Sequence, residues 1–132
     1  MVTRILMSVG ALALAAGLSG CEREVSFAKD VQPILQSNCI ECHDHAAEGV
    51  SQSGLSLADY DSLMHGTQFG AVVVPENSES STLYMVVAHK TDPKIHMPPH
   101  DPHALAKGRG DPLDEDQVET IKRWIDQGAK NN

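Results

Sequence analysis

The chain has 132 residues and a formal net charge of −8, from 10 Lys and Arg against 18 Asp and Glu. Nucleic acid is an unfavourable partner for such a chain, because binding to phosphates depends on Lys and Arg. The acidic balance favours a partner with a basic face instead. The length allows a targeting segment and one small domain, but not two domains.

Residues 1–20 have the pattern of a secretory signal peptide. Arg4 precedes an uninterrupted run of small and apolar residues from Ile5 to Leu18, which is typical of such signals. The run is too short and too rich in Ala and Gly for a membrane-spanning helix, which needs about 20 apolar residues. We therefore predict a signal peptide at 1–20, an anchor and short leader at 21–26, and a single domain at 27–132.

The signal ends in Leu18-Ser19-Gly20-Cys21, which resembles the lipobox of bacterial lipoproteins. A plain signal peptide cut nearby, with Cys21 left free or removed, is the alternative. Acyl chains on Cys21 would hold the domain at a membrane surface without spanning it. The expected location is the cell envelope, periplasm-facing or at the cell surface. In enteric bacteria, an Asp directly after the lipidated Cys is associated with retention in the inner membrane. This chain has Glu22 at that position instead, which favours the outer membrane.

The first expected helix runs from Val31 to about Ser37 and leads the chain to Cys39. Apolar residues recur there at helical spacing, and Asp30 is the expected N-cap. Pro33 then falls in the first turn, where amides lack partners within the helix.

The middle of the chain predicts short elements separated by turns. Residues 45–56 are rich in Gly and Ser and indicate a loop. Residues 57–66 predict a brief helix that ends at Gly66. Residues 71–75 form an extended piece closed by proline. Residues 78–89 predict a helix capped by Ser78 or Ser80, with three apolar residues on one face, Leu83, Val86 and Val87.

Residues 90–112 hold five of the seven prolines and predict a long loop of the kind that often carries function. The helix after it has the clearest signals in the chain. Asp114 is a good N-cap, and Gln117 completes a capping box. Gly128 is the expected terminator. The buried stripe of this helix is expected to consist of Val118, Ile121, Trp124 and Ile125. Leu113, just before the helix, can pack onto Val118.

The sequence Cys39-Ile40-Glu41-Cys42-His43 is the pattern of covalent haem c attachment. Two cysteines one helical turn apart can form thioethers with the vinyl groups of one porphyrin, and the following histidine can bind the iron. A zinc site would need a fourth ligand and lacks a second Cys pair. A redox dithiol would be expected within a βαβ unit, for which the sequence gives no sign. The pattern therefore predicts one haem c, with His43 as the proximal axial ligand.

The sixth iron ligand must be a sulfur or an imidazole, and several Met and His residues are available. Met64 and Met85 lie in apolar helical patterns, where Met usually fills the core. Met97 stands between His96 and two prolines that hold the backbone extended. Met97 is the expected ligand, and His96 or His100 is the alternative.

Several motifs in order resemble a known family: FAKDVQPIL, the CxxCH pattern, GLSL, VVPENSESSTLY, MPP and IKRWIDQGA. Residues 27–129 resemble the small class I-like cytochrome c domains called planctomycete-type cytochrome c. The resemblance implies an all-α, cytochrome c-like fold, with crossed N- and C-terminal helices around one covalently bound haem and with the Met of the MPP loop on the iron. No proline follows His43 before Pro75, so the acceptor for the His43 ring N–H is expected to be the carbonyl of Gly54 or Leu55.

These features predict an electron carrier outside the cytoplasm, tethered through Cys21. No general acid, base or nucleophile is implied, so we do not expect an enzyme. The alternative is a haem-based module that senses or binds a small ligand, with a displaceable or bis-His sixth position. The double proline after Met97 favours a fixed ligand and hence electron transfer.

Overall fold

The structure is a computed structural model that describes residues 22–45, 47–99 and 110–132. The described chain forms short helical segments and irregular connections, without a strand in these ranges; Thr67 and Gly70 form an isolated bridge. The predicted all-α fold is confirmed. The helical elements, in chain order, are η1 (Phe27–Val31), α1 (Gln32–Asn38), α2 (Ile40–His43), α3 (Glu48–Ser53), α4 (Tyr60–His65), η2 (Ser78–Ser80), α5 (Thr82–Val87), η3 (Pro93–Ile95) and α7 (Glu115–Asp126). Within the described ranges, no helix has both the length and the apolar character needed to cross a bilayer.

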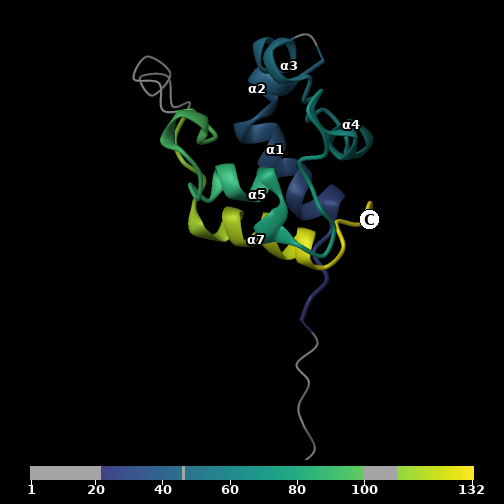
Figure 1. Ribbon diagram of the computed structural model, residues 1–132. Helices are drawn as coiled ribbons and strands as arrows, with labels where there is room; N and C mark the ends of the chain where they lie inside the picture. Colours follow the sequence, from purple (N-terminus) through teal and green to yellow (C-terminus); the bar gives the residue numbers. More distant parts are fainter. Residues whose placement is uncertain (1–21, 46, 100–109) are drawn as a thin grey trace, which may run out of the picture.

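The first and last helical segments pack together and form the base of the molecule. In Figure 1, α7 crosses the N-terminal helical segment at the lower end of the molecule. Helix α5 lies above α7, and α2 and α3 lie at the upper end of the molecule. Contacts join η1 to α7, α5 to α7, and α2 to α3. This arrangement agrees with the predicted pairing of the terminal helices.

The helical chain begins earlier than the sequence predicts. Phe27 opens a π-helical turn, and the side chain of Ser26 accepts from Lys29 N–H. Asp30 was the predicted N-cap of a helix starting at Val31, and this prediction was wrong. The Asp30 carboxylate instead accepts from Ser26 N–H at 2.8 Å. Both Ser and Asp side chains can accept from free amides at a helix start. Here Ser26 accepts from Lys29 N–H, and Asp30 accepts from Ser26 N–H.

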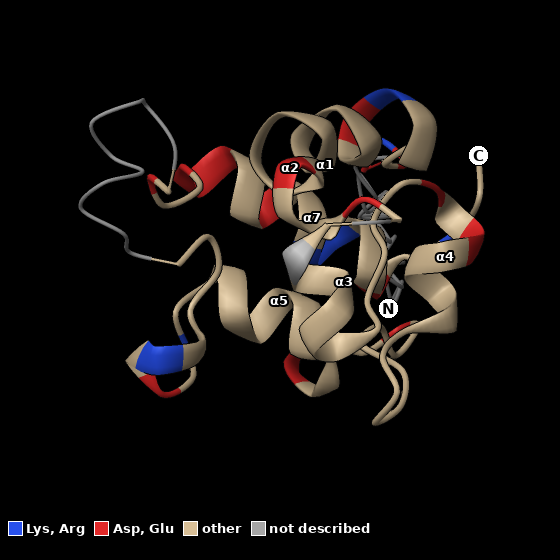
Figure 2. Cartoon of the chain, turned by 90° about the horizontal axis from the view of Figure 1, so that it is seen from above, with Lys and Arg blue, Asp and Glu red and all other residues tan. Residues whose placement is uncertain are grey.

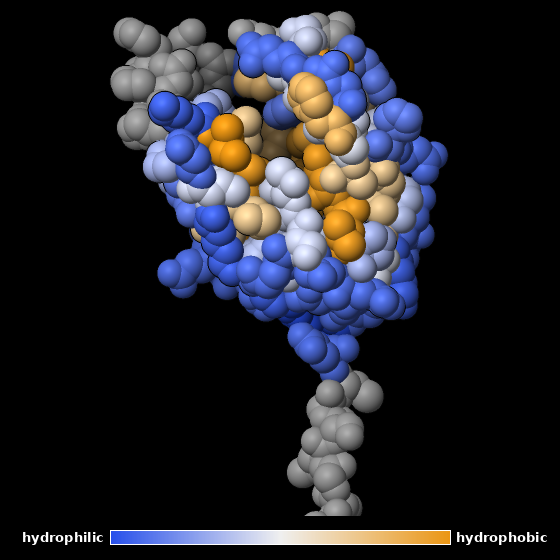
Figure 3. Space-filling model, in the orientation of Figure 1, coloured by the Kyte–Doolittle hydropathy of each residue, from blue (hydrophilic) through white to orange (hydrophobic). Residues whose placement is uncertain are grey.

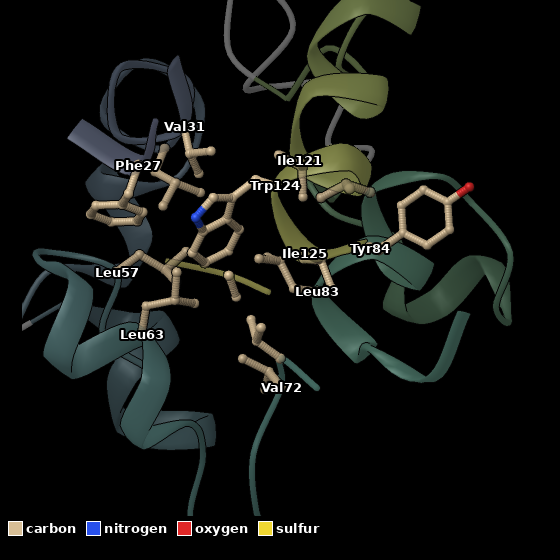
Figure 4. Packing of buried hydrophobic residues seen from close by; sticks show 14 of the residues in the cluster. Phe27, Val31, Leu57, Leu63, Val72, Leu83, Tyr84, Ile121, Trp124 and Ile125 are labelled. Atoms are coloured by element: carbon tan, nitrogen blue, oxygen red, sulfur yellow. The ribbon is translucent and has the colours of Figure 1, made fainter. Parts of the chain in front are cut away.

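The core surrounds Trp124, which is fully buried. Phe27 and Tyr60 lie beside its ring, with centroids 5.4 and 6.4 Å away, and contact each other edge to face at 5.2 Å. Figure 4 shows Trp124 between the N-terminal segment, the residues next to α4 and the stripe of α7. Trp124 Nε1–H donates to Lys130 O at 2.9 Å, so the buried indole has its polar atom paired.

The C-terminal helix matches its sequence signals. The Asp114 side chain accepts from Gln117 N–H, and the Gln117 side chain accepts from Asp114 N–H, which completes the capping box. Within the predicted stripe, Ile121, Trp124 and Ile125 are buried, whereas Val118 is half-buried. Gly128 follows the helix with φ +100°.

Other boundaries differ from the predictions. Part of the predicted loop at 45–56 is the helix α3. The segment after Pro75 is capped by Asn77, whose side chain accepts from Ser80 N–H, rather than by Ser78 or Ser80. Helix α5 follows it from Thr82. The brief helix α4 ends at Gly66 as predicted.

Candidate cofactor site

The Cys39–His43 motif forms one helical turn of its own. Cys39 ends α1 and begins α2, and its carbonyl accepts from Cys42 N–H at 3.1 Å and from His43 N–H at 3.0 Å. Both cysteines are free thiols. Residues three and four apart lie on one side of a helix, so the turn presents two thiols and an imidazole together.

The GLSL segment holds His43 at two points. The His43 ring Nδ1 lies 3.1 Å from Leu55 O, and Leu57 N–H donates to His43 O at 2.8 Å. When Nδ1 carries the proton and donates to Leu55, Nε2 is left with a free lone pair, the state in which histidine binds a metal. Of the two carbonyls expected from the sequence, the structure selects Leu55.

Helix α3 packs directly against this turn through Gly49. A Cβ at position 49 would lie 2.5 Å from Cys42 O and 2.9 Å from a carbon of the His43 ring. Only glycine permits this approach without displacing the backbone of the motif. Gly49 lies in a segment whose Gly and Ser content predicts a loop, so this role was not predicted from the sequence.

The two cysteines differ in environment. Burial raises the pKa of the Cys39 thiol to about 12, and nearby Cys42 adds to the effect. Reactive redox cysteines have the opposite shift, toward a stabilised thiolate. Among the described residues, no group of three or more His, Cys, Asp and Glu is placed to hold a metal ion. Neither finding favours the redox dithiol or the zinc site.

The expected distal residue, Met97, belongs to the segment that follows α5. Its N–H donates to Val86 O at 3.2 Å, and its side chain packs against the core while half-buried. The neighbouring His96 ring stacks on His89, with centroids 4.2 Å apart and planes 2° apart. The His96 Nε2 lies 3.0 Å from Thr91 O. His96 is therefore engaged locally, and His100 lies outside the described residues.

Half-buried apolar side chains surround the motif. Figure 3 shows a hollow bordered by hydrophobic surface, between α5 and the α1–α2 segment. We call residues 39–57 the motif end. Among the described residues from 36 to 55, none is fully buried. Several apolar side chains contact the core while keeping part of their surface exposed: Ile34, Cys39, Ile40, Leu55, Val86 and Met97.

A porphyrin needs apolar walls for its ring, thiols for its vinyl groups and a nitrogen for its iron. The motif end and its neighbours contain all three kinds of group. The residues present therefore fit a covalently attached haem. Cys21, the predicted lipid anchor, lies outside the described residues.

Comparison with known proteins gives one family. Residues 39–101 match the family model described as planctomycete cytochrome C. No curated protein and no solved structure matches the chain significantly. The match contains the CxxCH motif, the GLSL segment and the MPP sequence.

Proposed function

Because this chain carries a planctomycete-type cytochrome c domain, we propose that it is a mono-haem c-type cytochrome that passes single electrons between redox partners. Cytochrome c domains carry covalent haem c, are typically extracytoplasmic, and usually serve as electron carriers rather than enzymes. Our proposal adds one haem, a location outside the cytoplasm and a tether through lipidated Cys21. The fixed orientation of His43 by Leu55 O is the observation that carries it.

In this proposal, Cys39 and Cys42 would form thioethers with the haem, and the Nε2 of His43 and the sulfur of Met97 would bind its iron. When bound, haem supplies an iron that alternates between the ferric and ferrous states. Leu55 and Gly49 hold the imidazole in place, and the amide of Met97 is held by Val86. Ligands held in fixed positions rearrange little between the two oxidation states. A Met ligand also favours the ferrous state relative to a second His.

The test is the absorption spectrum of the purified, haem-loaded, oxidised protein. A Met sulfur on ferric iron gives a weak charge-transfer band in the far red. We expect this band in the wild type and its loss in Met97→Ala. Met85→Ala is the matched control, since Met85 is also half-buried and lies in α5 near the same segment, and it should keep the band.

The midpoint potential gives an independent readout. Met97→His should lower it clearly, whereas Met85→His should not. If haem is bound but the band is absent from the wild type, the sixth position is open or a histidine. The alternative, a haem-based sensor or binding module for small ligands, would then replace electron transfer as the proposed function.

The acidic chain is proposed to dock on partners with a basic face. Electrostatic docking is screened by salt over about 10 Å at 0.1 M. We therefore expect the bimolecular rate of electron transfer to a basic protein acceptor to fall as ionic strength rises. A rate that is flat or rises with salt would contradict this part of the proposal.

A further inference from the structure

The leader, residues 22–26, is bound to the domain from its first residues. Arg23 O accepts from Arg123 Nη2 at 2.9 Å and from Gln127 Nε2 at 3.3 Å, and Val25 N–H donates to Gln127 Oε1 at 2.7 Å. Arg123 Nε also lies 2.7 Å from Glu22 Oε1, as an ion pair without hydrogen-bond alignment. Helix α7 therefore holds the leader through side chains that contact its backbone.

The C-terminal residues complete this attachment. Ser26 Oγ donates to Asn132 O at 2.6 Å, and Ala28 N–H donates to the same oxygen at 3.0 Å. Lys130 pairs with Glu24 at 2.6 Å. Exposed ion pairs alone contribute about 0–1 kcal/mol each. The leader is held mainly by the hydrogen bonds and by the burial of Val25 and Phe27.

No spacer separates this bound leader from the proposed anchor. Cys21 immediately precedes Glu22, and consecutive Cα atoms lie about 3.8 Å apart across a trans peptide. A lipid on Cys21 would therefore bring the bound leader to the level of the lipid headgroups. We call residues 22–26 and 127–132, which lie together here, the terminal face.

The motif end lies on the opposite side of the molecule. In Figure 1 the described chain begins at the lower end of the domain, next to α7, whereas α2 and α3 lie at the top. A surface in contact with the terminal face would therefore be separated from the motif end by the thickness of the domain.

The motif end carries acidic residues without a basic residue among them. Residues 39–57 contain no Lys or Arg but three acidic residues, namely Glu41, Asp44 and Glu48. Figure 2 shows α2 with its acidic residue in red. At the terminal face, by contrast, Lys130 offsets Glu24, and Arg23 offsets Asp30 in η1. An anionic lipid surface would repel the motif end and accept the electrically balanced terminal face.

From this geometry we propose that the terminal face rests on the lipid surface and that the motif end is held away from it. The inference rests on the proposed lipidation of Cys21 and on the proposed haem. It identifies the electron-transfer partner as a protein with a basic surface that approaches from the aqueous side. A donor confined to the headgroup region would not reach the motif end.

The test compares one accessible thiol at each end of the molecule. In the lipidated, haem-loaded protein all three native cysteines are thioethers, so the wild type should not react with a maleimide. Lys130→Cys places a thiol on the terminal face, and Ser51→Cys places one in α3, at the motif end; both native side chains are exposed. Each variant is incorporated into vesicles of phosphatidylethanolamine and phosphatidylglycerol and labelled with a maleimide-polyethylene glycol.

We expect a several-fold loss of labelling rate at position 130 on vesicles, relative to the same variant with Cys21→Ser secreted as a lipid-free protein. The rate at position 51 should be the same in both forms. A Gly-Ser spacer of about 12 residues between Cys21 and Glu22, with a mean extension of about 20 Å, should restore labelling at position 130.

Equal loss at both positions, no loss at position 130, or a loss that the spacer does not relieve would overturn the orientation. Mass spectrometry of the same samples reports lipid and haem directly. A reactive thiol in the wild type, or a missing lipid or haem mass, would overturn the proposed function and the orientation with it. Loss of the orientation alone leaves these masses unchanged.

Discussion

The core around Trp124 and the motif end differ in how their side chains are stabilised. Around Trp124 the chain covers its own apolar surface, because Trp124, Ile121 and Ile125 are fully buried. At the motif end, the apolar side chains of Cys39, Ile40 and Leu55 are half-buried, and the position of the motif is set by contacts at Leu55, Leu57 and Gly49. Substitutions in the core should therefore change the free energy of unfolding, whereas those at the motif end should also change the spectrum of the haem.

The largest expected effect is that of Trp124→Ala. Removing a fully buried Trp from its contacts with Phe27 and Tyr60 should cost about 3–5 kcal/mol in the free energy of unfolding, measured by urea titration of the haem-loaded protein. Because small domains have only about 5–15 kcal/mol in total, Trp124→Phe provides a milder variant that should lose less.

Phe69→Ala is the control for this prediction. Its side chain is 85% exposed, and such surface changes usually stay within about 0.5 kcal/mol. If Trp124→Ala and Phe69→Ala destabilise equally, the protein's own packing is not what stabilises the core.

The next effect is that of Gly49→Ala at the motif end. The new Cβ would clash with Cys42 O and the His43 ring, and overpacking of this kind costs about 1–3 kcal/mol. Unlike Trp124→Phe, it should also alter the haem absorption spectrum, because the clash would displace His43, the proposed iron ligand. Val50→Ala, one residue further along α3, adds no atoms there and should leave the spectrum unchanged. A normal spectrum in Gly49→Ala would show that α3 does not position His43.

A smaller effect should follow from Asp114→Ala. The Asp114 carboxylate accepts from Gln117 N–H at 2.8 Å, and losing an N-cap costs about 0.5–2 kcal/mol. Asp114→Asn keeps an acceptor oxygen and should be close to wild type in urea unfolding. The haem spectrum should not change in either variant. A spectral change would mean that the C-terminal helix and the motif end are more tightly coupled than their contacts indicate.

The smallest effect concerns acid stability. The hydrogen bond from Ser26 N–H, followed by that from Arg23, lowers the pKa of Asp30 from its usual 3.8 in the folded protein. A lowered folded-state pKa adds stability that is present above the unfolded value and is lost as pH falls through the folded value. With Arg23 largely exposed, this amounts to at most about 1 kcal/mol.

Asp30→Asn should therefore reduce stability at pH 7 and flatten its decline below about pH 4. The measurement is urea unfolding across that range, with Asp116→Asn, on the exposed side of α7, as the control. A decline at low pH that is as steep in Asp30→Asn as in the wild type would show that other carboxylates cause it.

The extent to which the fold could be predicted follows the strength of local signals. Helix α7 combines a capping box, an apolar stripe and a terminal glycine, and each of these acts within a few residues, so its position could be predicted. Helix α3 has no such signals, since Gly49 and its serines are typical of loops. Its helical state depends on packing against α2, a contact that sequence periodicity does not reveal.

The same distinction applies to the candidate site. The Cys39, Cys42 and His43 spacing predicts covalent haem attachment because it depends only on one helical turn. The assignment of Met97 remains a proposal, supported by its hydrogen bond to Val86 and by the local engagement of His96. The role of Gly49 could not be predicted, because it arises from the approach of two helices.

The sequence by itself determined the all-α class, the haem attachment motif, the boundaries of α7 and the family resemblance, because these depend on residues close together in the chain. The tertiary structure alone decided that Leu55 accepts from the His43 ring, that the leader is bound to α7 and to Asn132, and that the acidic motif end lies opposite the terminal face. These features depend on contacts between residues far apart in sequence, such as Arg23 with Gln127 and Ser26 with Asn132. Only the folded chain brings such residues together.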